Sequence, residues 1–175
     1  MEELSQRAKQ PVSSVLAGPY GHPFHPILVT VPIGAWVASL VFDVASYVVD
    51  RPAFLVQGSR WLIGLGVLGA LAAATVGSLD FLAIPGGTPA RRTAVVHLSL
   101  NLGITCAYAG SFWWRQNLTV HQDPTPVGPL LLSMVSVAVL TVSGYLGGKL
   151  AYRYGVRVAG EDTQAEGYRS SGIRD

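Results

Sequence analysis

Four long runs of apolar residues, separated by short polar stretches, dominate the hydrophobic pattern of this chain. The runs cover about residues 26–49, 61–84, 92–114 and 129–151. A helix needs about 20 residues to cross a hydrocarbon core of ~30 Å, and each run reaches that length. The pattern therefore predicts an all-α fold, an integral-membrane antiparallel four-helix bundle over residues 26–157. Residues 1–25 precede the bundle and residues 158–175 follow it.

The composition and the placement of the basic residues change this picture only by adding an orientation. The chain is 50% hydrophobic and 13% charged, with a mean hydropathy of +0.40, whereas soluble domains carry about 25% charged residues. Lys and Arg gather at one end of the predicted bundle, at Arg7, Lys9, Arg91, Arg92, Lys149, Arg153, Arg157, Arg169 and Arg174. The opposite end has Arg51, Arg60 and Arg115. The positive-inside rule then predicts that both termini are cytoplasmic. The tail 158–175 lacks apolar periodicity and is expected to be disordered.

The sequence also excludes several classes of function. A net charge of only +2 argues against nucleic acid as a partner, because the basic residues flank apolar runs. The one cysteine, Cys106, lies inside an apolar run and permits no intramolecular disulfide. No phosphate-binding loop, dinucleotide fingerprint or nucleophile elbow is present. We therefore expect a membrane protein without catalytic residues that is not an enzyme by itself.

Small and polar residues recur every four positions on two of the predicted helices. On helix 61–84 they are Gly69, Ala73 and Gly77, and on helix 92–114 they are His97, Asn101, Thr105 and Ala109. Helices in lipid associate through small residues, and a polar stripe facing hydrocarbon is costly. Both stripes should therefore face the interior of the bundle. Asp80, which continues the first stripe, should then lie at the same depth as His97 on a neighbouring helix.

The segment GHPFHPILVTVPIG begins the first apolar run and places two histidines at its edge. Pro26 suits the first turn of a helix, which makes His25 the expected N-cap. Pro32 removes the hydrogen bond to the Leu28 carbonyl and should bend this helix. His25, Asp80 and His97 then converge near the cytoplasmic end of the bundle, with His22 close by.

This convergence leads to a haem hypothesis. His25 and His97 would hold the iron of haem b from opposite sides, and Asp80 would orient the ring of His97. Arg91 and Arg92 at the same membrane face would neutralise the two propionates. In this interpretation the protein is an electron-transfer component with a redox protein or a membrane complex as its partner.

Two other interpretations remain open at this stage. One is a site for a transition metal without haem, built from His22, His25, His97 and Asp80. The other is a structural or accessory subunit of a membrane complex with no cofactor, in which His97 simply hydrogen-bonds Asp80. A homodimer is compatible with either.

Three further polar residues are assigned structural or surface roles. Asp43 is level with Arg60 at the outer end and is expected to pair with it. His121 lies in the outer loop and is expected to be an ordinary surface residue.

Three segments carry a resemblance to a known family: GHPFHPILVTVPIGAWVASLVFD, GSLDFLAIPGGTPARRTAVVHLSLN and GYLGGKLAYRYGVRV. They resemble the bacterial integral-membrane family catalogued as domain of unknown function 2231, over roughly residues 20–158. The resemblance implies a single domain of four membrane helices in the bacterial cytoplasmic membrane. Relatives of this family occur fused to Rieske-type or cytochrome-like domains, which suggests electron transfer. The family's recurring polar residues map onto His22, His25, Asp43, Asp80, His97 and Asn101. Some relatives have a histidine in the closing segment, where this chain has Lys149 and Tyr154.

Overall fold

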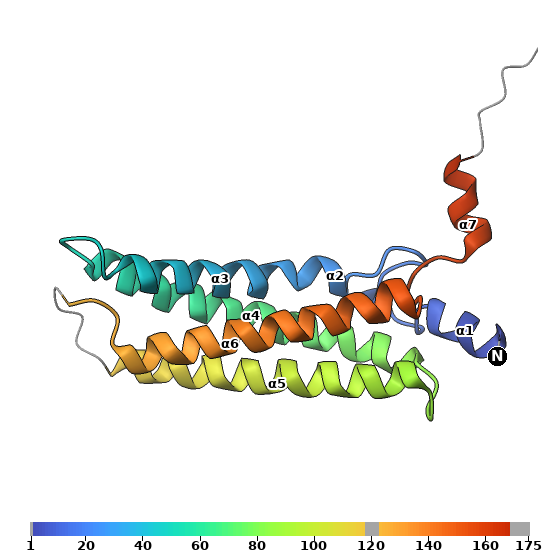
Figure 1. The fold of residues 1–175 in the computed structure, drawn as a ribbon. Helices are drawn as coiled ribbons and strands as arrows, with labels where there is room; N and C mark the ends of the chain where they lie inside the picture. Colours follow the sequence, from blue (N-terminus) through green and yellow to red (C-terminus); the bar gives the residue numbers. More distant parts are fainter. Residues whose placement is uncertain (1, 118–122, 169–175) are drawn as a thin grey trace, which may run out of the picture.

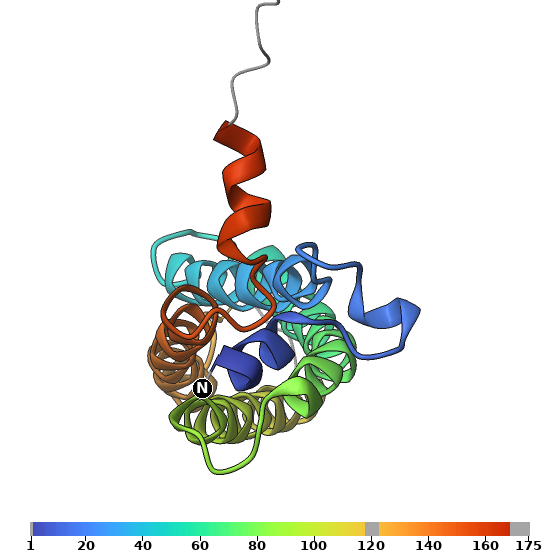
Figure 2. The same cartoon turned by 90° about the vertical axis from the view of Figure 1, so that its right-hand side faces the viewer.

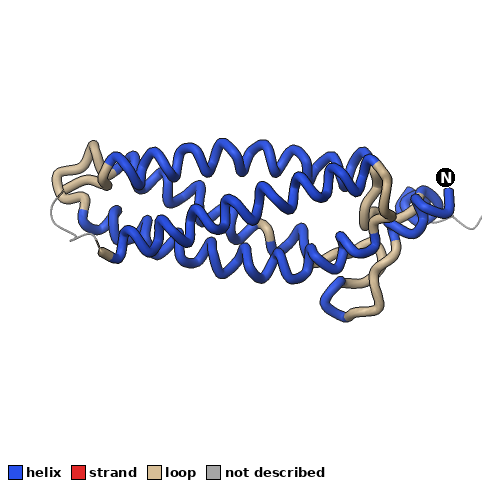
Figure 3. The backbone as a smooth tube through the Cα atoms, turned by 90° about the horizontal axis from the view of Figure 1, so that it is seen from below, coloured by secondary structure: helices blue, strands red, loops and turns tan. Residues whose placement is uncertain are grey.

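Four long antiparallel helices form the body of the protein in the computed structural model (Figure 1). The structure describes residues 2–117 and 123–168, which contain helices and no strand. In chain order, the four spans are α2 and α3 (His25–Leu28 and Thr30–Ala45), α4 (Ala53–Ala83), α5 (Pro89–Gln116), and α6 with its extension η2 (Val127–Gly148 and Lys149–Arg153). All four spans are long and apolar enough to cross a membrane, which confirms the predicted bundle. The connections gather at the two ends of the bundle (Figure 3).

The spans differ from the predicted ranges at two informative places. The first span is interrupted at Val29, between α2 and α3, in the turn whose Leu28 carbonyl cannot bond to Pro32. The interruption lies where the bend was expected. Helix α4 begins at Ala53 rather than near residue 61, directly after Pro52 at the N-cap. At the next turn Thr88 caps α5, since its side chain accepts a hydrogen bond of 3.1 Å from the Arg91 N–H.

Short helices occupy both terminal segments, although the sequence predicted no regular structure there. Helix α1 (Glu2–Lys9) lies across the end of the bundle, in front of its centre, and η1 (Val15–Ala17) follows it (Figure 2). Helix α7 (Glu161–Ala165) and η3 (Glu166–Tyr168) lie in the tail predicted to be disordered, whose residues 169–175 lie outside the described part of the chain. Both terminal segments lie at the same end of the bundle, as an even number of spans requires (Figure 1).

The bundle has an approximate two-fold symmetry along its length. Viewed from the end, α3 lies opposite α5 and α4 opposite α6 (Figure 2). Asp43 of α3 and Arg115 of α5 form an ion pair across the centre, and they are 72 positions apart in the sequence. The rings of Trp36 and Tyr108 have the same spacing and stack across the centre at 4.4 Å between centroids. Equivalent positions of two successive hairpins therefore meet on the long axis.

Contacts within each hairpin repeat in the same way. The indole N–H of Trp36 donates to the Ile63 carbonyl at 3.4 Å, and the hydroxyl of Tyr108 donates to the Ser133 carbonyl at 3.5 Å. A Cβ on Gly58 would lie 2.7 Å from the Phe42 ring, and one on Gly128 would lie 2.6 Å from the Trp114 ring. The hairpin α2–α3–α4 and the hairpin α5–α6 are therefore structural repeats. The buried core between them consists of Trp36, Ile63, Ile104, Tyr108 and Leu140.

Candidate histidine-pair site

Two histidines, one from each hairpin, face one another near the end of the bundle that carries the termini. His25 begins α2 and His97 lies on α5, and their ring centroids are 6.5 Å apart with the ring planes at 88°. Both side chains are half-buried. They have the same spacing in the sequence as Asp43 and Arg115. The predicted convergence of His25 and His97 is therefore present, and the symmetry of the bundle produces it.

Each histidine docks on the second helix of its own hairpin in the same manner. His25 Nδ1 lies 2.9 Å from the Ala73 carbonyl oxygen of α4, and His97 Nδ1 lies 2.9 Å from the Ser143 carbonyl oxygen of α6. The residue four positions after Ala73 is Gly77, and the residue four positions after Ser143 is Gly147.

Glycine at these positions makes the carbonyls accessible. A helical carbonyl bonds to the N–H four residues later, so a side chain at that position would crowd any further donor. A Cβ on Gly77 would lie 2.7 Å from His25 Nδ1, and one on Gly147 would lie 3.1 Å from His97 Cε1. The small-residue stripes thus leave room for the two rings to lie against α4 and α6, in addition to allowing close helix packing.

The hydrogen bonds fix the chemical character of both rings. A carbonyl oxygen can only accept, so Nδ1 carries the hydrogen in each ring, and in the neutral ring Nε2 then presents a lone pair. Around His97, the Ser143 hydroxyl lies 3.1 Å from Nδ1 and the Asn101 amide lies 3.3 Å from Nε2. The shorter bonds of that amide run to the Ser143 hydroxyl at 2.7 Å and the His97 carbonyl at 2.8 Å. The predicted inward stripe of α5 is confirmed at Asn101, whose own carbonyl accepts from Thr105 at 2.8 Å.

Asp80 has a different partner from the one expected. Its carboxylate accepts a hydrogen bond of 2.7 Å from Nε of Arg157, whereas Nδ1 of His97 is bonded to Ser143. Asp80 therefore does not orient His97. Arg157 is 3% exposed and follows η2 on a backbone with φ of 61°.

Arg157 joins the terminal segments to the bundle. Its Nη2 donates to the carbonyls of Ala17 and Gly18, at 2.6 and 3.1 Å, and its backbone N–H donates to the Ala8 carbonyl at 3.0 Å. Its Nη1 is buried and has no hydrogen-bond partner among the residues that the structure describes. The guanidinium thus links η1 to α4, and the backbone N–H of the same residue links α1 to them.

The remaining predicted site residues lie apart from the pair. His22 is exposed in the loop before α2, with its Nδ1 3.5 Å from the Tyr20 carbonyl. Arg91 donates to the Phe81 and Ile84 carbonyls at the end of α4, at 2.7 and 3.2 Å, and Arg92 is exposed. Among the described residues, no three His, Cys, Asp or Glu side chains are grouped to hold one metal ion. The predicted four-residue metal set is therefore not assembled.

His25 also differs slightly from its expected role at the helix end. It is the first residue of α2, and Phe24 is the N-cap. This shift brings the ring over α4, where it reaches the Ala73 carbonyl.

A second polar cluster lies at the opposite end of the bundle. Asp43 forms a bidentate ion pair with Arg115, whose Nη1 and Nη2 donate to Oδ1 and Oδ2 at 2.8 and 2.7 Å. It does not pair with Arg60, the partner that the sequence suggested. Arg115 is 4% exposed and Asp43 is fully buried. Hydroxyl groups complete the hydrogen bonds of this pair, and they belong to Ser59, Ser111, Thr125 and Ser133. His121 lies outside the described residues.

The residues that sequence reasoning missed are Arg115, Ser143 and Arg157. The first and last were counted only as charges that set the topology. A signal for both existed, because each intramembrane carboxylate requires a nearby cation. The signal for Ser143 was Gly147, which follows it by one turn on α6.

Fold and site together define a four-span membrane protein with paired, equivalent histidines on the axis of its bundle. The model of the family described as a predicted membrane protein, DUF2231, matches residues 21–160. The chain belongs to this family, as the resemblance indicated. No curated protein and no solved structure matches the chain.

Proposed function

We propose that this protein binds haem b between His25 and His97 and transfers electrons within the bacterial cytoplasmic membrane. The observation that carries the proposal is the pair itself. The two rings lie 6.5 Å apart, and a backbone carbonyl fixes the Nδ1 of each. Two metal–nitrogen bonds of about 2 Å, with the ring radii added, place imidazole centroids roughly 6 Å apart across one metal ion. Fixing one ring nitrogen is how proteins prepare the other to bind a metal.

The number of ligands favours haem over a bare ion. Zinc in structural sites takes four protein ligands, and catalytic zinc takes three with a water. The described residues offer only two imidazoles at this place. Haem iron needs no more than two axial ligands from the protein, since the porphyrin supplies the others. A transition metal without haem is the second form of the proposal, and spectroscopy separates the two.

Arg157 provides a group that suits a haem carboxylate. Asp80 follows Gly77 by three residues on α4, so the Asp80–Arg157 pair lies about 5 Å along the helix beyond the point where His25 packs against Gly77. The unpartnered Nη1 of Arg157 is buried there, and guanidinium binds carboxylate strongly. Arg91 is less suitable than the sequence suggested, because its guanidinium already bonds two carbonyls of α4.

The chain's own residues would do three things for such a cofactor. His25 and His97 would bind and orient it, and Ala73 and Ser143 would hold the tautomer of each ring. Helix α1, whose own Ala8 is only 5% exposed, covers the end of the bundle and would limit the access of water. Bound haem supplies one-electron exchange, and a redox protein or membrane complex would be its partner.

The test is the optical spectrum of the detergent-purified full chain after expression with haem supplementation, oxidised and then reduced. We expect a Soret band that shifts on reduction. His25→Ala and His97→Ala should each abolish haem retention, whereas the control His22→Ala should retain it, because His22 is exposed and remote from the pair.

Two results would contradict the haem proposal. One is full haem retention by the His97→Ala protein. The other is a purified protein without a Soret band. In that second case, stoichiometric metal in the same sample would support the second form of the proposal, and its absence would support a structural or accessory subunit instead.

A further inference from the structure

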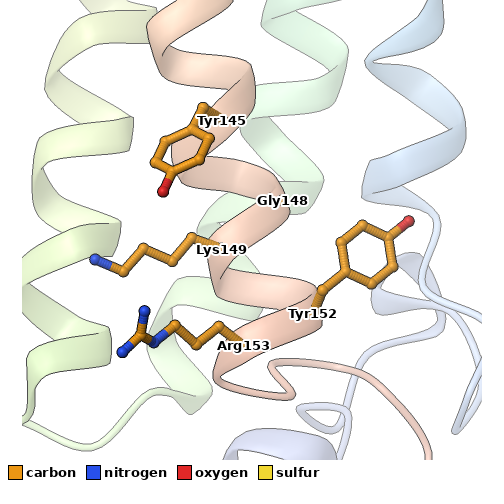
Figure 4. A pocket seen from close by; sticks show the side chains of 5 residues that line it. All are labelled: Tyr145, Gly148, Lys149, Tyr152 and Arg153. Atoms are coloured by element: carbon orange, nitrogen blue, oxygen red, sulfur yellow. The ribbon is translucent and has the colours of Figure 1, made fainter.

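A groove of about 390 Å³ opens on the outside of the bundle, at the end that carries the termini. It is lined by Tyr145, Gly148, Lys149, Tyr152 and Arg153. Figure 4 shows Tyr145, Lys149 and Arg153 extending from the same side of α6 and η2 toward α5, whereas Tyr152 extends to the other side. The segment η2 is a π-helix. Such turns are rare overall, and those that occur are often found at functional sites.

The two positive charges of this groove belong to Lys149 and Arg153, and Lys149 also interacts with Tyr154. Among residues 2–117 and 123–168, no carboxylate forms an ion pair with Lys149 or Arg153. Nζ of Lys149 lies 5.6 Å from the centre of the Tyr154 ring. The pKa of Tyr154 is lowered from its usual value, first by a side-chain hydrogen bond with Thr93 and also by the nearby positive charges of Lys149 and Arg153. The groove therefore presents a positive field without an internal counter-ion.

The two hairpins of the bundle differ in sequence at this groove. The interior contacts of α6 have counterparts on α4, such as Ser143 with Ala73 and Gly147 with Gly77. At the equivalent positions of α4, the residues matching Tyr145, Lys149 and Arg153 are Thr75, Leu79 and the buried Ala83. Two basic side chains and an aromatic ring are thus present at these positions on one hairpin only.

The position of the groove indicates the ligand. It lies at the end of an apolar span, where tyrosine and snorkelling lysine or arginine side chains reach the headgroup level. Tyr145 is 73% exposed, so its ring is available to lipid. Arg92, on the first turn of the adjacent α5, is exposed and adds a third positive charge at this end. The ligand is thus an anion that also belongs to the bilayer.

We propose that the groove between α5 and α6 binds the headgroup phosphate of an anionic phospholipid through Lys149 and Arg153, with Tyr145 against the glycerol region. The proposal needs only a membrane-embedded protein, so it stands or falls independently of the histidine pair. Each basic residue near an anionic headgroup strengthens binding roughly five-fold.

The experiment is a titration of the lipid-stripped, detergent-solubilised full chain with dioleoyl-phosphatidylglycerol or dioleoyl-phosphatidylcholine, read by native mass spectrometry. We expect the anionic lipid to bind at least ten-fold more tightly. The double variant Lys149→Gln/Arg153→Gln should weaken its binding by about 30-fold. The matched control Arg51→Gln/Arg60→Gln removes the same charge at the opposite end and should change binding less than two-fold. The charge-conserving variant Lys149→Arg/Arg153→Lys should retain the selectivity.

Three results would overturn the proposal. The first is unchanged binding of phosphatidylglycerol to the Lys149→Gln/Arg153→Gln protein. The second is an equal loss in the control at the opposite end, which would indicate a general charge effect. The third is complete displacement of the lipid by millimolar inorganic phosphate, which would indicate a site for a soluble anion.

Discussion

The ion pair between Asp43 and Arg115 gives the sharpest test of the packing, because both groups are buried and their partners are known. Asp43→Asn removes the negative charge but keeps the shape of the side chain. Arg115, which is 4% exposed, would then retain its charge with only hydroxyl and carbonyl groups around it. Removing one partner of a buried pair costs about 3–5 kcal/mol of unfolding free energy.

This cost converts into a large change of melting temperature. For a chain of this size, 1 kcal/mol corresponds to about 2–4 °C. We therefore expect Asp43→Asn to lower the midpoint of thermal unfolding by roughly 6–20 °C. The assay is thermal unfolding of the detergent-solubilised chain, followed by circular dichroism at one fixed detergent concentration. The control is Arg60→Gln at the same end, since Arg60 pairs with no carboxylate among the described residues.

The control should shift the midpoint by no more than about 2 °C, because surface substitutions usually stay within ±0.5 kcal/mol. A shift of that size for Asp43→Asn as well would refute the reasoning. The exchange Asp43→Arg/Arg115→Asp adds a second check. The two positions are equivalent in the two hairpins, so the exchanged pair should recover part of the loss. The recovery should be incomplete, since the hydroxyl groups around the pair are not symmetric.

Two other predictions concern the glycine against which His25 packs and the repeated hairpins. Gly77→Ala places a Cβ 2.7 Å from His25 Nδ1, so overpacking should lower the free energy of unfolding by about 1–3 kcal/mol and weaken any cofactor retention. Gly34→Ala, whose Cβ meets nothing within 4 Å, should instead be neutral or stabilising, and equal effects of the two changes would contradict the docking of His25. Residues 1–86 and 87–175, co-expressed as separate chains, should co-purify in detergent, because each contains one hairpin and the two meet along the axis. The two-hairpin assembly would be contradicted if the unchanged halves did not co-purify. It would also be contradicted if Asp43→Asn did not weaken their co-purification.

Much of the fold followed from local patterns in the sequence. Apolar length alone is sufficient to define the four spans, since only a continuous helix satisfies its backbone across the hydrocarbon. Pro32 was sufficient to locate the interruption of the first span. The periodicity of Asn101 and Thr105 was sufficient to point that face of α5 inward, because a polar stripe is costly in lipid.

The pairing of the charged groups could not be read in the same way. Depth along a helix is visible in the sequence, but the order of helices around a bundle and the path of a terminal segment are not. Asp43 was therefore assigned to Arg60, which is level with it, although Arg115 lies across the axis. Asp80 was assigned to His97, although Arg157 returns from beyond η2 to reach it.

The two-fold symmetry was also invisible before the helices were packed. The hairpins share few identical residues at equivalent positions, His25 with His97 and Gly77 with Gly147 among them, because only the positions that meet near the axis are constrained. Local patterns along the chain are enough to establish a four-span membrane protein with ionisable groups inside. Which of these groups meet depends on the rotation that places one hairpin against the other, and that rotation is visible only in the folded bundle.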